Sequence, residues 1–216
     1  MTDPADNSIL LTGFESFGEF DVNPTELIVK ALDGEIIDDI TIKGMVLPVV
    51  FGKAGDLLIN AVDETKPKAV ICLGLAGKRH DISLERLAVN LDDADIPDNA
   101  GSKPVDSPVV TEGPPACWST LPVKAILAAL KEQGIPASLS MSAGTYVCNH
   151  VFYRLMYELQ STPLIPAGFI HLPPPEVLED KDSEPGLSIL TRATRSIVEV
   201  TLIKLDNHRK THIINV

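Results

Sequence analysis

The chain has 216 residues, of which 44% are hydrophobic and 22% charged, and its formal net charge is −12. That composition is typical of a globular protein, and the length allows one sizeable core. The negative charge argues against nucleic acid and against an anionic membrane surface as partners, because both require a basic face.

Strand-like and helix-like segments alternate along the first half of the chain. The apolar run Ser8–Leu11 predicts a strand, and a loop rich in glycine and phenylalanine follows it. The next helix begins with Asn23 as N-cap and Pro24 as first residue, with Glu26 completing a capping box, and it ends near Gly34. Further strands are predicted over 40–47, 69–74 and 85–91, and a helix over 53–65.

The same alternation continues to the C-terminus. Helices are predicted over 124–133, from Cys148 onward, and over 187–204, and strands over 137–141 and 168–171. The proline- and aspartate-rich stretch Pro173–Pro185 is interpreted as a mobile surface loop. The segment 70–73 is apolar at every position, which is typical of a sheet covered on both faces. We therefore expect an α/β fold: a single three-layer α/β/α sandwich with a mostly parallel, twisted central sheet, one domain over 1–216.

Three cysteines, Cys72, Cys117 and Cys148, are spaced too irregularly for a disulfide framework or a zinc site. The N-terminal residues lack the apolar stretch of a secretory signal, and no apolar run reaches transmembrane length. We expect a cytoplasmic protein with free thiols and no metal.

Cys148 is the strongest candidate for chemistry. It follows a predicted strand and a small-residue elbow, Ser142–Thr145, and it opens an amphipathic helix. A thiol at a helix N-terminus lies near unpaired N–H groups and the positive end of the helix dipole. This setting favours the thiolate, so we expect Cys148 to be a nucleophile.

A cysteine nucleophile needs a base and a group that orients the base. His171 ends the apolar strand Gly168–Ile170, and sites in open α/β sheets lie beyond the carboxyl ends of strands. His171 is therefore the candidate base, although a satisfied core histidine fits the pattern equally well. The other histidines, His80, His150, His208 and His212, fit less well by position. The pattern leaves the carboxylate open between Glu85 and the acidic run 92–98.

Other motifs are excluded by their composition. The run Gly13–Gly18 lacks the Lys-Ser/Thr ending of a phosphate loop, and 74–77 lacks the dinucleotide-binding spacing. The chain contains no serine nucleophile elbow and no metal-ligand cluster in sequence.

Several segments together resemble the pyrrolidone carboxyl peptidase family of cysteine peptidases, also called pyroglutamyl peptidase type I. They are Leu-Leu-Thr-Gly-Phe-Glu-Ser-Phe-Gly at 10–18, Asn-Pro at 23–24, Leu-Glu-Arg-Leu-Ala-Val-Asn at 84–90, Ile-Pro-Asp-Asn-Ala-Gly at 96–101, Ser-Ala-Gly-Thr-Tyr-Val-Cys-Asn-His at 142–150 and Gly-Phe-Ile-His at 168–171. The matches occur in order over most of the chain.

The resemblance implies a catalytic triad of Cys148, His171 and Glu85. It also implies hydrolysis of the amide bond after an N-terminal pyroglutamyl residue through a thioester, without metal or cofactor, by a cytoplasmic homotetramer. Its substrate pocket carries over to Phe14, Phe17, Val49, Ile96, Tyr146 and Val147. Such an apolar pocket suits a flat, uncharged lactam.

Three positions depart from the family pattern. Asp95 stands where the family usually has an arginine near the site, Leu75 stands where glutamine is common, and the loop after His171 differs. Asp95 would oppose an oxyanion unless Lys78 or Arg79 compensates or Asp95 faces away. Two alternatives therefore stay open: a cysteine amidase or deacylase for another small acyl or lactam group, and a non-catalytic binder of pyroglutamyl-capped peptides.

Overall fold

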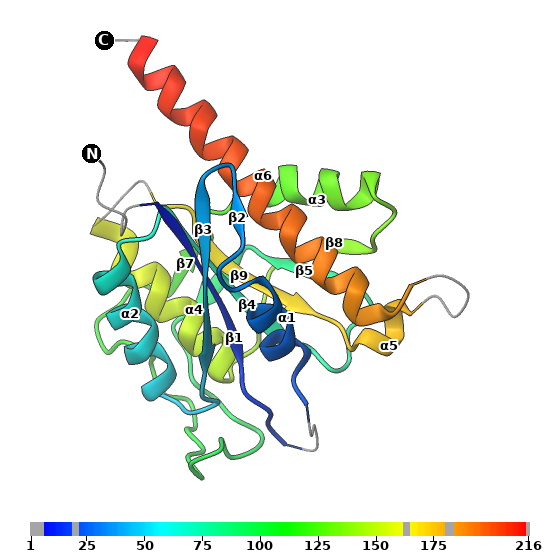
Figure 1. The fold of residues 1–216 in the computed structure, drawn as a ribbon. Helices are drawn as coiled ribbons and strands as arrows, with labels where there is room; N and C mark the ends of the chain where they lie inside the picture. Colours follow the sequence, from blue (N-terminus) through cyan, green and yellow to red (C-terminus); the bar gives the residue numbers. More distant parts are fainter. Residues whose placement is uncertain (1–6, 19–21, 162–164, 180–183, 215–216) are drawn as a thin grey trace.

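A seven-stranded sheet forms the middle of the molecule (Figure 1). The computed structural model describes residues 7–18, 22–161, 165–179 and 184–214, without the side chains of 161 and 206–214. In spatial order the strands are β2 (Ile36–Ile37), β3 (Ile40–Leu47), β1 (Ser8–Phe14), β4 (Ala69–Leu75), β9 (Ala167–Leu172), β5 (Ile82–Glu85) and β8 (Ala137–Ser140).

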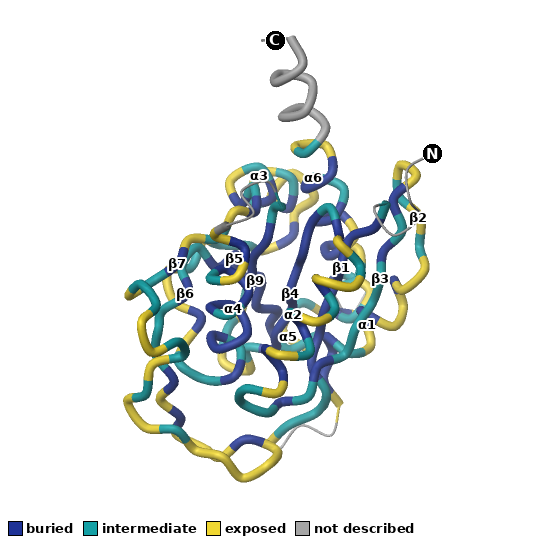
Figure 2. Tube along the Cα trace, turned by 90° about the vertical axis from the view of Figure 1, so that its left-hand side faces the viewer, coloured by how far each residue is buried: buried dark blue, intermediate teal, exposed yellow. Residues whose placement is uncertain are grey.

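Most neighbouring strands in this sheet are parallel. The pairs β3–β1, β1–β4 and β4–β9 are parallel, and so is β5–β8. The pairs β2–β3 and β5–β9 are antiparallel. The strands β1, β4 and β9 are buried along their whole length (Figure 2), as parallel strands covered on both faces must be.

Helices cover both faces of the sheet (Figure 1). On one face lie α2 (Lys53–Thr65) and α4 (Val147–Glu158), with the short helix η2 (Leu159–Ser161) after α4. On the other lie α1 (Pro24–Leu32), α3 (Val123–Glu132) and α6 (Gly186–Ile214), with α5 (Pro175–Leu178) against α6. Two apolar clusters fill the spaces between the layers. The predicted α/β/α sandwich with a mostly parallel sheet is confirmed.

The chain around residue 86 differs from its prediction. The expected strand over 85–91 is wrong, because β5 ends at Glu85 and the chain then enters a separate two-stranded sheet. That sheet pairs β6 (Leu87–Val89) with β7 (Ala116–Trp118). Large apolar residues alternate at 82 and 84 before Arg86 and, one position out of phase, at 87 and 89 after it, and the pairing partner changes at the same point.

Other differences are at short elements and ends. The strands β2 and β7 were not predicted, and at two and three residues they are too short to show a period. The helix α5 lies within the predicted loop 173–185, of which residues 180–183 fall outside the described residues.

The start of α1 is held by Asn23, as predicted. Its fully buried side chain accepts hydrogen bonds from the backbone N–H and the hydroxyl of Thr25, and Pro24 is the first helical residue. The Glu26 carboxylate accepts from Lys30 at 2.6 Å rather than completing the expected capping box. Among the described residues, no helix is both long and apolar enough to cross a bilayer.

Gly13 determines how closely β1 approaches α1. A Cβ atom at this position would lie 2.6 Å from the carbonyl oxygen of Thr25, a backbone atom that cannot rotate away. We expect Gly13→Ala to lower the free energy of unfolding by about 1–3 kcal/mol through overpacking. Urea denaturation checks this, with a reduced midpoint at an unchanged m-value as the expected result. An unchanged midpoint would show that α1 moves away at no cost.

Candidate active site

Cys148 lies at the start of α4, directly after the elbow. It is the second residue of the helix and is partly exposed. Its Sγ atom lies 3.0 Å from the point where a Cβ atom on Gly74 would be. Gly74 is the cross-strand partner of His171 in the β4–β9 pair. The thiol therefore lies over the two central strands at the level of His171.

His171 lies on the face of the sheet that carries α4. Phe169, two residues earlier on β9, packs in the same apolar cluster as Val147 and Val151 of α4, and side chains two residues apart on a strand share a face. The rings of Phe169 and His171 lie with centroids 4.9 Å apart. The thiol of Cys148 and the imidazole of His171 consequently share one side of the sheet.

Glu85 holds the imidazole of His171. Its Oε1 atom lies 2.8 Å from Nδ1 of His171, and both side chains are buried. A carboxylate accepts, so Nδ1 carries the proton and Nε2 remains as the basic nitrogen. Strand β5, which ends at Glu85, pairs directly with β9. The structure thus brings Cys148, His171 and Glu85 together.

Arg79 is a fourth member of this group, which the sequence suggested only as a possible compensating charge. Its Nη1 donates to the same Oε1 atom of Glu85 at 2.6 Å, and its Nη2 donates to the carbonyl oxygen of Ser142 at 2.9 Å. Arg79 therefore neutralises the buried carboxylate and ties it to the elbow before Cys148.

The reason given for expecting Cys148 and His171 at one edge of the sheet is wrong. Because β5 is antiparallel to β9 and parallel to β8, the strand before Cys148 runs opposite to the strand that carries His171. Their carboxyl ends do not share an edge. The residues meet because the elbow after β8 leads the chain to the start of α4, which places the thiol over Gly74, the cross-strand partner of His171.

The thiol of Cys148 is not held as a thiolate. Burial and the negative charge of Glu85 raise the pKa of Cys148 to about 12, against the lowering effects of Arg79 and of its own backbone N–H. The sequence-based expectation of a helix-stabilised thiolate is therefore wrong for the unliganded protein. Desolvation of the charged form outweighs the helix N-terminus.

His171 is shifted toward the neutral form. Burial lowers the pKa of His171, and the hydrogen bond and charge of Glu85 offset this only in part. A neutral imidazole with its proton on Nδ1 can accept a proton at Nε2. Thiol and imidazole are therefore both shifted toward their neutral forms, and transfer of the thiol proton to Nε2 would generate a thiolate.

A small apolar pocket opens beside the thiol. About 230 Å³ of empty space lies within it, including the open space at its mouth, and its mostly apolar walls suit an uncharged group. The lining residues are Phe14, Phe17, Asn23, Val49, Leu75, Tyr146, Val147 and Cys148. Five of the six predicted pocket residues are in this set.

Ile96 and Asp95 are not in the pocket lining. Ile96 is 48% exposed, and Asp95 is exposed beside it. The negative charge that departs from the family pattern therefore lies in solvent rather than against the thiol. Asn23 and Leu75 line the pocket without having been predicted as site residues. Leu75 ends β4, so its place at the end of a central strand was the available signal.

The remaining cysteines and histidines lie elsewhere. Cys72 is fully buried, and burial raises its pKa to about 12, as expected of a core thiol. Cys117 accepts a hydrogen bond from Gln160. His80 is exposed, and the side chains of His208 and His212 fall outside the described residues. Within the described part of the chain, no three His, Cys, Asp or Glu side chains gather as metal ligands.

Relatives of known sequence resemble this chain over most of its length. A protein named pyrrolidone-carboxylate peptidase from Klebsiella pneumoniae (strain 342) is 52% identical over 165 residues, 76% of this chain and 77% of that protein. One of the same name from Bacillus cereus (strain AH820) is 46% identical over 198 residues, 90% of this chain and 92% of that protein.

Solved structures agree in fold. Pyroglutamyl peptidase I from Bacillus amyloliquefaciens matches with a TM-score of 0.83 at 40% identity, covering 91% of this chain and 95% of that one. A mutant of pyrrolidone carboxyl peptidase from the hyperthermophile Pyrococcus furiosus matches with a TM-score of 0.84 at 45% identity, covering 92% and 99%. The family model for pyroglutamyl peptidase matches residues 7–203. Fold, site and relatives agree, and the chain belongs to the pyroglutamyl peptidase family.

Proposed function

We propose that this protein is a cysteine peptidase that removes the N-terminal pyroglutamyl residue from peptides, with residues 1–216 forming one catalytic domain. The observation that carries the proposal is the Glu85–His171 hydrogen bond of 2.8 Å beside the Cys148 thiol, at the end of a small apolar pocket. Family membership supports the same activity.

The reaction begins with proton transfer within the neutral pair. Nε2 of His171 takes the thiol proton, and the Cys148 thiolate attacks the pyroglutamyl carbonyl carbon to give a tetrahedral oxyanion. Glu85 stabilises the imidazolium that forms, as its position against Nδ1 allows. The backbone N–H of Cys148, at the helix start, donates to the oxyanion.

Collapse of the oxyanion breaks the amide bond. The imidazolium of His171 gives its proton to the departing amine, and the acyl group remains as a thioester on Cys148. Water, deprotonated by His171, then attacks the thioester carbonyl, and the proton returns to the sulfur as pyroglutamate leaves. The cycle requires no metal or cofactor.

The pocket selects the acyl group. Pyroglutamate has no free α-amine, so its site has no need of a carboxylate to bind an ammonium group. Phe14, Phe17, Val49, Tyr146 and Val147 offer apolar and aromatic surface to the flat ring. We assign Ile96, exposed next to the Pro97 carbonyl that accepts from the Tyr146 hydroxyl, to the mouth of the pocket.

Cys148→Ser tests the nucleophile. We expect kcat/KM on a fluorogenic pyroglutamyl amide to fall by at least about a thousandfold, as for other catalytic-triad residues. Cys117→Ser is the matched control and should keep wild-type turnover, because Cys117 lies under α4 away from the pocket. Equal turnover of wild type and Cys148→Ser would refute the mechanism, and pyroglutamyl peptide affinity without any product would favour the binder.

Arg79→Gln tests the electrostatics of the triad. The Arg79 charge lowers the pKa of His171, so its removal raises that pKa. Because His171 must be neutral to take the thiol proton, the acid limb of the kcat/KM profile should move to higher pH. Arg86→Gln, which removes a neighbouring cation stacked on Trp118, should leave the profile unchanged. An unmoved acid limb in Arg79→Gln would contradict this role.

We further propose that the protein is a cytoplasmic homotetramer, as the family resemblance implies. Large apolar side chains on the described surface, among them Ile36 (67% exposed) and Ile203 (54% exposed), support burial between subunits. Sedimentation equilibrium should give the mass of four chains. A monomer mass at micromolar concentration would contradict the proposal.

A further inference from the structure

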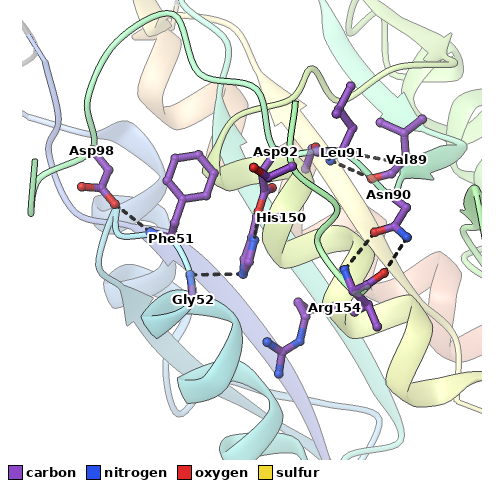
Figure 3. A network of polar contacts seen from close by, with 12 residues as sticks. Phe51, Gly52, Val89, Asn90, Leu91, Asp92, Asp98, His150 and Arg154 are labelled. Carbon is purple, nitrogen blue, oxygen red and sulfur yellow. Dashed lines mark hydrogen bonds and ion pairs between the residues drawn. The ribbon is translucent and has the colours of Figure 1, made fainter. Parts of the chain in front are cut away.

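A second buried histidine–carboxylate pair lies beside the pocket, and the proposed reaction does not use it. His150 is on α4, two residues after Cys148, and is 5% exposed. Its Nδ1 atom lies 2.7 Å from Oδ2 of Asp92, which is 7% exposed (Figure 3). As in His171–Glu85, the Nδ1 atom lies against a carboxylate oxygen, but Nε2 of His150 faces the backbone of Gly52.

The other ring nitrogen of His150 fixes where the proton is. Nε2 lies 3.2 Å from the backbone nitrogen of Gly52, and a backbone N–H can only donate. Nε2 therefore accepts, and the proton is on Nδ1, from which it is donated to Asp92. Both hydrogen bonds require one neutral tautomer of His150.

These two bonds join three separate segments. His150 belongs to the first turns of α4, and Gly52 is the N-cap of α2, with a left-handed φ of 70°. Asp92 belongs to the segment after β6, where its backbone pairs with Ser107. Figure 3 shows His150 between Gly52 and Asp92.

The joined segments carry one wall of the pocket. The ring of Phe51 packs edge-on against His150, with centroids 5.7 Å apart, and edge-on against Tyr146, with centroids 5.4 Å apart. Tyr146 and Val49 both line the pocket. The backbone N–H of Phe51 is held in addition by Asp98, at 2.9 Å. The position of Phe51 thus links His150 to the Tyr146 side of the pocket.

We propose that His150 is a positioning residue for the acyl pocket. By accepting from Gly52 it fixes the segment Val49–Gly52, and through Phe51 it fixes the ring of Tyr146 against which the substrate ring packs. His150 touches no reacting atom, so it acts on binding of the acyl group rather than on the chemical step. This inference rests on the proposed function for the identity of the acyl group.

Two amide variants separate the two hydrogen bonds of His150. In His150→Asn the side-chain amide stands where Nδ1 stands and keeps the contact with Asp92, but it is too short to reach Gly52. In His150→Gln the longer side chain presents its carbonyl oxygen near the former Nε2 position and accepts from Gly52. The proposal therefore predicts a defect in His150→Asn that His150→Gln largely repairs.

The measurements are kcat and KM on a fluorogenic pyroglutamyl amide, and the inhibition constant of 2-pyrrolidone, the bare five-membered lactam. We expect His150→Asn to raise both KM and the inhibition constant about five- to tenfold, the effect of one buried hydrogen bond, with kcat within about twofold. For His150→Gln we expect values within about twofold of wild type. Far-UV circular dichroism verifies that each variant is folded.

Arg154→Met is the matched control. Arg154 also joins α4 to α2, through its ion pair with Asp56 at 3.0 Å, but Asp56 is largely exposed and neither residue lines the pocket. The methionine keeps much of the aliphatic stem and removes the charge. KM and the inhibition constant should stay at wild-type values, because an exposed ion pair contributes little.

The outcomes distinguish this inference from the proposed function. Wild-type cleavage with unchanged binding in His150→Asn would overturn the positioning role alone, and so would a similar rise in KM in Arg154→Met. A fall in kcat at constant KM in His150→Asn would overturn it as well. A wild-type protein that binds 2-pyrrolidone without cleaving the substrate would refute the proposed function, while the inhibition constants would still decide the role of His150.

Discussion

Glu85 is a carboxylate with no solvent exposure at the end of strand β5, and the arrangement of the site follows from how its charge is compensated. An unpaired charge in such a position would be very costly. Two donors meet on one oxygen, Nδ1 of His171 at 2.8 Å and a guanidinium nitrogen of Arg79 at 2.6 Å. The first fixes the tautomer of the imidazole. The guanidinium of Arg79 also donates to the carbonyl oxygen of Ser142, so Arg79 joins the loop after β4 to the elbow before Cys148.

Burial strengthens the hydrogen bonds of Glu85, and it also keeps the thiol of Cys148 protonated by raising its pKa. The thiol of Cys148 lies against Gly74, and Cys148 packs against the apolar cluster that contains Phe169, where the thiolate would be poorly solvated. The backbone N–H at the start of α4 lowers the pKa of Cys148, but by less than desolvation raises it. A protonated thiol is less prone to oxidation and to unselective reaction than a thiol that is permanently ionised. In the proposed mechanism the nucleophile forms when His171 takes the proton, so reactivity would depend on the neutral state of that imidazole.

The site region contains two histidine–carboxylate pairs, His171–Glu85 and His150–Asp92, and they differ in what the Nε2 atom of each histidine contacts. In His171 that nitrogen is left for the thiol. In His150 it accepts from the backbone of Gly52, so the imidazole becomes a structural link between α4 and the start of α2. We propose that the first pair serves proton transfer and that the second holds the pocket wall formed by Phe51 and Tyr146. Both pairs connect residues far apart in the chain, by 86 and 58 positions.

The sequence alone determined the fold class, most of the longer elements, the cap at Asn23 and Pro24 and the place of Cys148 at a helix start, because these depend on local periodicity, caps and turns. The family motifs supplied Glu85 and most of the pocket, which periodicity could not choose. Only the tertiary structure decided the antiparallel course of β5 and β8, the break at Arg86, the partners of Arg79 and His150, and the direction of the Cys148 pKa shift. Strand direction and pairing depend on contacts between distant segments. Desolvation depends on what those segments bury, and no local pattern around Cys148 contains that information.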